Sequence, residues 1–145
     1  MKRVISWLLV ILWMALIFYL SHQPATESNS LSTGITERIV TIIERVTSDI
    51  DFDVSSFNHI VRKNAHFFAY LILGVLVSNA LKNNDFKGTN RFLIALAICV
   101  LYAISDEIHQ LFIPGRAGQV RDIIIDSAGV VVGISAYLEY GKLKK

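Results

Sequence analysis

The chain has 145 residues, enough for one domain, of which 53% are hydrophobic and only 18% charged, with a mean hydropathy of +0.50. Since ordinary soluble domains carry about 25% charged residues, this composition argues against a soluble helical bundle and predicts an integral membrane protein. The formal net charge of +2 indicates no class of partner, and a single cysteine, Cys99, excludes an intrachain disulfide.

Four nearly charge-free segments predict membrane-spanning helices, which need roughly 17–25 mostly apolar residues. The first segment follows Lys2 and Arg3 as a signal peptide would, but it is long for a signal and no clear cleavage site follows it, so we expect a retained span. The third reaches span length only if it continues through Phe112. The predicted spans cover about residues 4–20, 65–81, 92–112 and 123–138 of a single membrane domain, 1–145.

The long loop after the first span carries a second helical pattern. Isoleucine and valine recur at helical spacing over about residues 35–50, with glutamate and arginine between them, which predicts an amphipathic helix lying on the membrane or against the ends of the spans. Residues 24–34, PATESNSLSTG, have the composition of a polar linker. The predicted fold class is therefore an all-α membrane protein with four transmembrane helices and one extracytoplasmic amphipathic helix.

The distribution of cations predicts how the chain threads through the membrane. Four spans place both termini on one side, and Lys and Arg close to the spans are more numerous on that side. By the positive-inside rule, we expect both termini in the cytoplasm and the first long loop outside. The cations on the terminal side are Lys2, Arg3, Lys82, Lys87, Arg91, Lys142, Lys144 and Lys145.

Polar and titratable side chains gather at the predicted outer ends of the spans. Residues three or four apart share a helix face, and because lipid penalises buried charge these faces should converge on one pocket. The residues concerned are Gln23 after the first span, Lys63, His66 and Tyr70 on the second, Asp106, Glu107, His109 and Gln110 on the third, and Arg116, Arg121, Asp122 and Asp126 around the start of the fourth.

The fourth span combines acids with small residues on one stripe. Asp122 and Asp126 are followed by Gly129-x-x-x-Gly133, a spacing that lets another helix approach closely. Asp126 lies a turn deeper than Asp122 and needs a partner, for which Lys63, the arginines and the histidines of the pocket are the candidates.

Four motifs at these positions match a known pattern. They are Ser21-His22-Gln23, Arg62-Lys63-x-x-His66-Phe67-x-x-Tyr70-x-x-Leu73-Gly74, Tyr102-Ala103-x-x-Asp106-Glu107-x-His109-Gln110-x-Phe112-x-Pro114-Gly115-Arg116, and Asp122-x-x-x-Asp126-x-x-Gly129. With them the chain resembles the VanZ-like family, small membrane proteins named for a teicoplanin-resistance factor. The resemblance covers all but about residues 31–58, and it implies a multi-pass protein of the bacterial cell membrane linked to glycopeptide resistance. It assigns no role to any residue.

Two functions are compatible with these residues, and the first is an enzyme acting on a lipid-linked substrate at the outer leaflet, such as a polyprenyl phosphate or a cell-wall precursor. His66 or His109 would be the nucleophile or the proton-transfer group, oriented by Asp106, Glu107 or Asp126. Cationic side chains would bind phosphate oxygens. The substrate-binding candidates are Lys63, Arg116, Arg121, Gln23, Gln110, Tyr70 and Asp122.

The alternative is a non-catalytic binder of an anionic lipid or cell-wall precursor, although the acids of the pocket roughly neutralise its cations. Each polar group taken singly is also explained by a buried network that satisfies itself. A metal-dependent hydrolase using His22, His66, His109 and the acids is less favoured because no H-E-x-x-H spacing appears. A transporter is disfavoured because the cytoplasmic halves of the spans lack charges. We expect no cofactor, with a divalent metal ion as the less favoured alternative. The expected partner is a membrane lipid or a lipid-linked cell-wall intermediate, and we expect no nucleic acid.

Overall fold

The structure is a computed structural model, and it describes residues 1–44 and 54–143. Within these ranges the regular secondary structure is helical: α1 (Lys2–Ser21), α2 (Ala25–Glu44), α3 (Val54–Asn83), α4 (Gly88–Gln110) and α5 (Val120–Leu143). Helices α1, α4 and α5, together with Ile60–Asn83 of α3, are long and apolar enough to cross a membrane. The predicted all-α fold with four transmembrane helices and a further helix in the first loop is confirmed.

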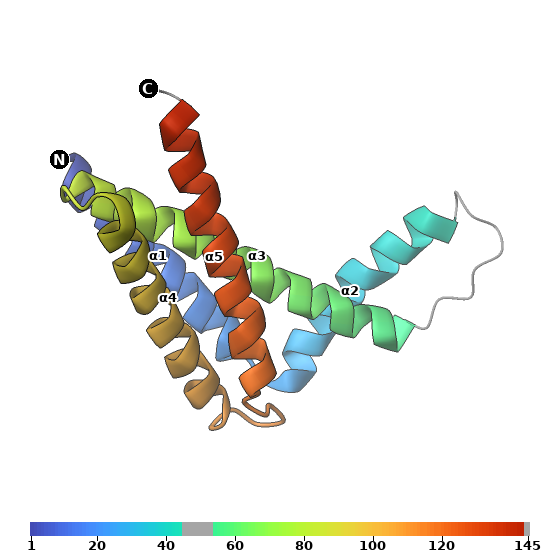
Figure 1. Ribbon diagram of the computed structural model, residues 1–145. Helices are drawn as coiled ribbons and strands as arrows, with labels where there is room; N and C mark the ends of the chain where they lie inside the picture. Colours follow the sequence, from blue (N-terminus) through green and yellow to red (C-terminus); the bar gives the residue numbers. More distant parts are fainter. Residues whose placement is uncertain (45–53, 144–145) are drawn as a thin grey trace.

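The four long helices form a bundle with two distinct ends (Figure 1). Both termini and the α3–α4 turn lie at one end, called here the terminal end; the α1–α2 and α4–α5 connections lie at the other, called here the site end. Helix α2 packs against the first part of α3, to one side of the bundle. The antiparallel arrangement brings residues far apart in the sequence together at the site end.

Helix α1 carries a broad apolar face that no other described element covers. Leu8, Leu12 and Leu16, spaced by one helical turn, are all exposed, as are most of its other large hydrophobic side chains. A soluble protein of this size would not leave so large an apolar surface in water. This face therefore contacts lipid.

Helices α3 and α5 touch backbone to backbone. A β-carbon added to Gly129 would lie 2.3 Å from the carbonyl oxygen of Phe67, and one added to Gly133 would lie 2.1 Å from that of Leu71. Neither distance leaves room for any side chain, so the Gly-x-x-x-Gly spacing serves the close helix approach that it predicts. This contact places the middle of α5 directly beside the middle of α3.

The region expected to be a polar linker, residues 24–34, is instead largely helical, because α2 begins at Ala25. Pro24 opens this helix, and its carbonyl accepts the N–H of Ser28 at 3.0 Å. The serines that suggested a turn are accommodated: the hydroxyl of Ser32 donates to the Ser28 carbonyl at 2.6 Å. The part of the predicted 35–50 helix after residue 44 lies outside the described residues.

The third predicted span, 92–112, extends beyond the end of α4 at Gln110. The N–H groups of Phe112 and Ile113 bond to carbonyls three residues back, so a tight turn replaces the helix. Pro114 explains this end, since it disfavours helical geometry at the residue before it.

Candidate functional site

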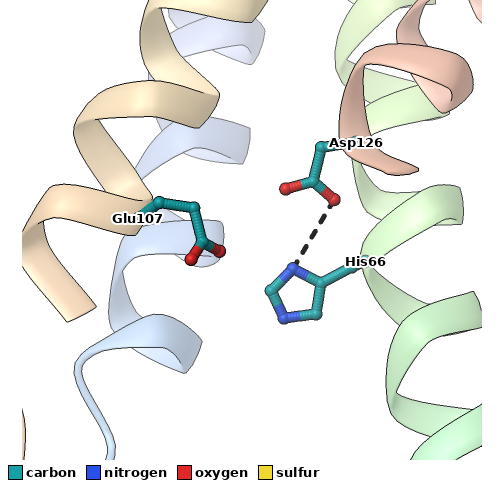
Figure 2. A group of neighbouring side chains, drawn as sticks. All are labelled: His66, Glu107 and Asp126. Atoms are coloured by element: carbon teal, nitrogen blue, oxygen red, sulfur yellow. Dashed lines mark ion pairs between the residues drawn. The ribbon is translucent and has the colours of Figure 1, made fainter. Parts of the chain in front are cut away.

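Three helices each contribute one ionisable side chain to a group at the site end. His66 comes from α3, Glu107 from α4 and Asp126 from α5, and Figure 2 shows them pointing toward one another. One ligand atom from each lies within 4.8 Å of the other two. We call these three residues the central cluster. Sequence spacing predicted that His66 and Asp126 face the bundle interior, and the helix crossings bring Glu107 to them.

Asp126 is the most isolated member of the central cluster. Its side chain is 0% exposed, and neither carboxylate oxygen has a hydrogen-bond partner among the described residues. The ionisable group beside it is His66, with 3.6 Å between His66 Nδ1 and Asp126 Oδ1, which is too long for a good hydrogen bond. A buried carboxylate without hydrogen bonds costs several kcal/mol, so this position is maintained at the expense of stability.

Glu107 is held in place by the chain that follows α4. Its Oε2 accepts the backbone N–H of Gln119 at 2.8 Å, and its Oε1 lies 3.3 Å from the amide nitrogen of Gln110. The same amide nitrogen lies 3.2 Å from Oδ2 of Asp106, which also accepts the Ser21 hydroxyl at 2.8 Å. Gln110 therefore bridges two buried acids, and Ser21 ties Asp106 to the end of α1.

Tyr70 lies in the same interior. Its side chain is fully buried, its ring centroid is 6.2 Å from that of Tyr102, and its hydroxyl has no hydrogen-bond partner among the described residues. Buried hydroxyls are normally bonded. The Tyr70 hydroxyl and the Asp126 oxygens thus remain without hydrogen bonds in this part of the interior. The described side chains therefore do not satisfy every buried polar group there, which is a property of sites that bind a further group.

The cations proposed as partners for Asp126 lie elsewhere. Lys63 pairs with Asp122, with 2.8 Å between Nζ and Oδ1, in a position where both side chains are largely covered. Arg121 is exposed at the start of α5. The residues described therefore give Asp126 no Lys or Arg partner in an ion pair, and His66 is the group beside it.

Arg116 closes the end of α1. Its Nε donates to the carbonyl of Gln23 at 2.9 Å, and one terminal nitrogen donates to the carbonyl of Leu20 at 3.1 Å. Helix carbonyls at a C-terminus lack intrahelical partners, and a cation there also complements the helix dipole. Burial, followed by the neighbouring charge of Arg62, lowers the pKa of the Arg116 guanidinium from its ordinary value, although an arginine stays protonated. Among the described contacts, Arg116 serves α1 and the Gln23 backbone.

A small surface depression lies next to the central cluster. It is lined by Arg62, Lys63, His66, Asp122 and Ile125. Among the members of the central cluster, His66 alone takes part in this lining, with a side chain 22% exposed. His66 is thus the one member that meets both the surface and the buried acids.

His109 lies apart from this group. Its Nε2 is 3.1 Å from Nδ1 of His22, and the two rings stack with 5.3 Å between centroids. Phe18 packs against His109 with 4.5 Å between their centroids. A hydrogen bond between two imidazoles needs one donor and one acceptor nitrogen, so at least one ring of this pair is neutral.

Sequence reasoning missed two groups that hold the acids. No role was predicted for the Ser21 hydroxyl, although it bonds to Asp106. Its position at the end of the first predicted span, at the same depth in the membrane as the acids, could have indicated this contact. The Gln119 N–H acts through the backbone, so its residue type carries no signal. The His22–His109 pair could be found only by knowing how α1 and α4 are rotated toward each other.

Comparison with known proteins agrees with this arrangement. The VanZ/LLP1 family profile matches residues 6–141, which include all four candidate transmembrane helices almost entirely and every residue of the central cluster. No curated protein and no solved structure matches the chain. With a family match over nearly its whole length and four apolar helices of spanning length, the chain is a multi-pass membrane protein that belongs to the VanZ/LLP1 family.

Proposed function

We propose that the protein is an enzyme that acts on the phosphate-containing head of a lipid-linked substrate, such as a polyprenyl phosphate or a cell-wall precursor. One observation carries the proposal: His66 lies between a depression lined by Arg62 and Lys63 and two buried acids, Glu107 and Asp126. Asp126 has no hydrogen-bond partner among the described residues. A histidine in this position can exchange protons with a bound head group and be oriented from behind.

The depression supplies the binding half of the proposal. Arg62 and Lys63 line it, and cations form their strongest hydrogen bonds with phosphate and carboxylate oxygens. Arg121, exposed next to Asp122 in the chain, adds positive charge at the same end. The lipid tail of the substrate would remain in the membrane beside the helices, while its head group binds over this shallow depression.

The central cluster supplies the chemical half. In this proposal His66 takes a proton from a water or hydroxyl that attacks phosphorus, the bond from phosphorus to the leaving oxygen breaks, and the proton returns to that oxygen. Asp126, behind the imidazole, orients the ring and stabilises its protonated form. His109 is left out of this scheme because it pairs with His22.

The alternative is a non-catalytic binder of the same anionic head group. The two cations of the depression favour it, since they would hold phosphate without any chemistry. It leaves the unpartnered oxygens of Asp126 unexplained, because a buried acid weakens the binding of an anion. For that reason we favour the enzyme.

Paired measurements on purified protein in nanodiscs separate the two functions. For His66→Gln we expect turnover of a polyprenyl phosphate or pyrophosphate to fall about 10²–10⁴-fold, the usual contribution of proton transfer, with affinity little changed. Lys63→Gln should weaken affinity. His109→Gln is the matched histidine control and should retain both. A His66→Gln protein that is folded and turns over substrate as wild type does would exclude this role.

We further propose that the site end faces outside, with both termini in the cytoplasm, and that the activity contributes to glycopeptide resistance. Cysteines introduced at exposed Ser30 and Lys87 report the orientation, since the native Cys99 is fully buried and should not react. An impermeant thiol reagent applied to whole cells should label position 30 and spare position 87. The opposite labelling would reverse the orientation. Teicoplanin sensitivity of cells carrying His66→Gln tests the link to resistance.

A further inference from the structure

The three side chains of the central cluster have the composition of a metal site, and we infer that His66, Glu107 and Asp126 together bind one divalent cation. This inference rests on the proposed function and revises one part of it. With the ion bound, His66 would hold the ion, and the ion, in place of the imidazole, would activate the attacking water by lowering the pKa of that water. The ion also adds a charge that would hold an anionic head group. As a binding site it can be tested without any substrate.

The geometry fits a single ion. Ligand atoms of the three residues lie within 4.8 Å of one another. Nitrogen and oxygen ligands sit about 2.0–2.2 Å from a zinc ion, so two of them can be at most about 4.4 Å apart. Small side-chain rotations would close the difference. The three residues come from three different helices, so the helix crossings, and not a single turn, set the spacing.

The hydrogen bonding of the cluster leaves coordination sites free. Both oxygens of Asp126 are buried with no hydrogen-bond partner among the described residues, as is the Tyr70 hydroxyl. Glu107 accepts one bond at 2.8 Å from Gln119 and only a long one, 3.3 Å, from Gln110. Because each carboxylate oxygen has two lone pairs, Glu107 retains capacity for an ion. The bonds from Gln119 and Gln110 would then orient it as a ligand.

The charge of the site also favours a bound cation. Asp106, Glu107 and Asp126 bring three carboxyl groups into the interior, all of them buried. Lys63 is paired with Asp122 and Arg116 with the end of α1, so neither compensates them. The buried carboxylates repel an incoming phosphate. A bound dication reverses that repulsion and attracts it.

The ligand types select the class of ion. Imidazole suits zinc and other transition metals, whereas magnesium and calcium prefer oxygen ligands throughout. Three protein ligands with further positions open are typical of catalytic zinc sites. We therefore expect Zn²⁺ or Mn²⁺, with the open position toward the depression where His66 reaches the surface.

The test begins with the wild-type protein in nanodiscs, stripped with a chelator and titrated with Zn²⁺, Mn²⁺ and Co²⁺. One equivalent should bind, and Co²⁺ should develop visible absorption. Pulsed electron paramagnetic resonance of the Cu²⁺-loaded protein should detect one coordinated imidazole. Two imidazoles would place the ion on the His22–His109 pair and overturn the assignment, and the absence of stoichiometric binding would overturn it outright. Neither result depends on a variant that might misfold.

Variants then identify the ligands. Loss of a group that merely supports a ligand costs roughly 10–100-fold in affinity, so His66→Gln, Glu107→Gln and Asp126→Asn should each weaken binding at least about tenfold. His109→Gln is the matched histidine control and should bind as wild type does. If it loses as much affinity as the three ligand variants, the ligand set is wrong.

The two proposals can fail separately. A protein that binds one equivalent of zinc and turns over no lipid-linked substrate refutes the proposed function and keeps the cation site. A protein that turns over the substrate after complete removal of metal, and binds none, keeps the function and refutes the cation site.

Discussion

The two ends of the helix bundle treat charge in opposite ways. At the terminal end, Arg3 of α1 pairs with Asp85 in the α3–α4 turn, with both side chains well exposed. At the site end, Asp126 is 0% exposed and has no hydrogen-bond partner among the described residues. Exposed pairs are inexpensive to maintain, whereas a buried, unpaired acid is costly. The contrast indicates that charged groups at the terminal end serve stability, whereas those at the site end serve a function.

Half-buried polar groups at the terminal end also have partners, as the exposed Arg3–Asp85 pair does. The Tyr137 hydroxyl of α5 donates to Asn79 of α3 at 2.8 Å, and both Lys82 and Arg91 lie 5.9 Å from the centre of its ring. Arg91, whose Nε has no hydrogen bond among the described residues, thus still gains a cation–π contact.

Asp126→Asn should separate activity from stability. We expect turnover to fall about 10²–10⁴-fold, as when an acid that orients a histidine is lost, while thermal stability in detergent, measured without added metal, stays the same or rises. The second effect follows because the variant removes a buried carboxyl group that accepts no hydrogen bond among the described residues. Asp85→Asn, at the terminal end, is the control and should retain turnover. Were Asp126 half of a tight buried pair, its removal would instead cost about 3–5 kcal/mol.

Gly133→Ala should destabilise the bundle, because its methyl group would meet the Leu71 carbonyl at 2.1 Å. Overpacking typically costs about 1–3 kcal/mol, and here the obstacle is backbone. Gly141→Ala is the matched control on the same helix, where an added β-carbon meets nothing within 4 Å. Alanine favours a helix over glycine by about 1 kcal/mol, so we expect the control to be neutral or stabilising in a thermal unfolding series.

Arg116→Gln should lower stability more than it lowers substrate affinity. The guanidinium bonds two carbonyls at the end of α1, and such bonds to a charged group contribute about 1.5–3 kcal/mol before solvent screening reduces them at this partly exposed position. Arg121→Gln removes an exposed cation from the same end and should leave stability unchanged. If Arg116→Gln weakens lipid binding while unfolding normally, Arg116 contacts substrate after all.

Arg3→Gln should have the smallest effect. Its exposed pair with Asp85 is worth less than about 1 kcal/mol and is screened by salt. A fall in the melting temperature of Arg3→Gln that persists at high salt would mean that this pair stabilises the terminal end more strongly than an exposed ion pair normally does.

The sequence was sufficient for the spans and for the helix faces, because both depend on local periodicity. Apolar windows placed the four helices, and the spacing from Asp126 to Gly133 placed α5's inward face. Contacts that depend on how the helices are rotated about their axes, or on the path of the loops, could not be predicted from the sequence. His109 shares a face with Asp106 by spacing, yet α1 approaches from that side and supplies His22. Arg116 was expected to bind substrate because a cation can hold phosphate oxygens, and its bonds to the Gln23 and Leu20 carbonyls could not be predicted because they depend on the path of the 111–119 connection.

Packing also overrode composition in α2. A serine-rich stretch reads as linker when taken alone, since serine competes with the helix for backbone hydrogen bonds. Here Ser32 and Thr36 are buried, so tertiary contact supplies what local propensity lacks. No local rule indicates which polar stretch will find such a contact.

The glycine contact between α3 and α5 has a consequence for how this membrane domain can diverge. Phe67, whose carbonyl meets Gly129, directly follows His66, and Asp126 stands one turn before Gly129. The spacing between His66 and Asp126 is therefore set by the backbone contact of the two helices and not by the loops. Glu107 belongs to a separate helix that is positioned through side chains and the 111–119 connection. Under the proposed function, substrate preference can therefore change through α4 and the loops while the His66–Asp126 pair stays fixed.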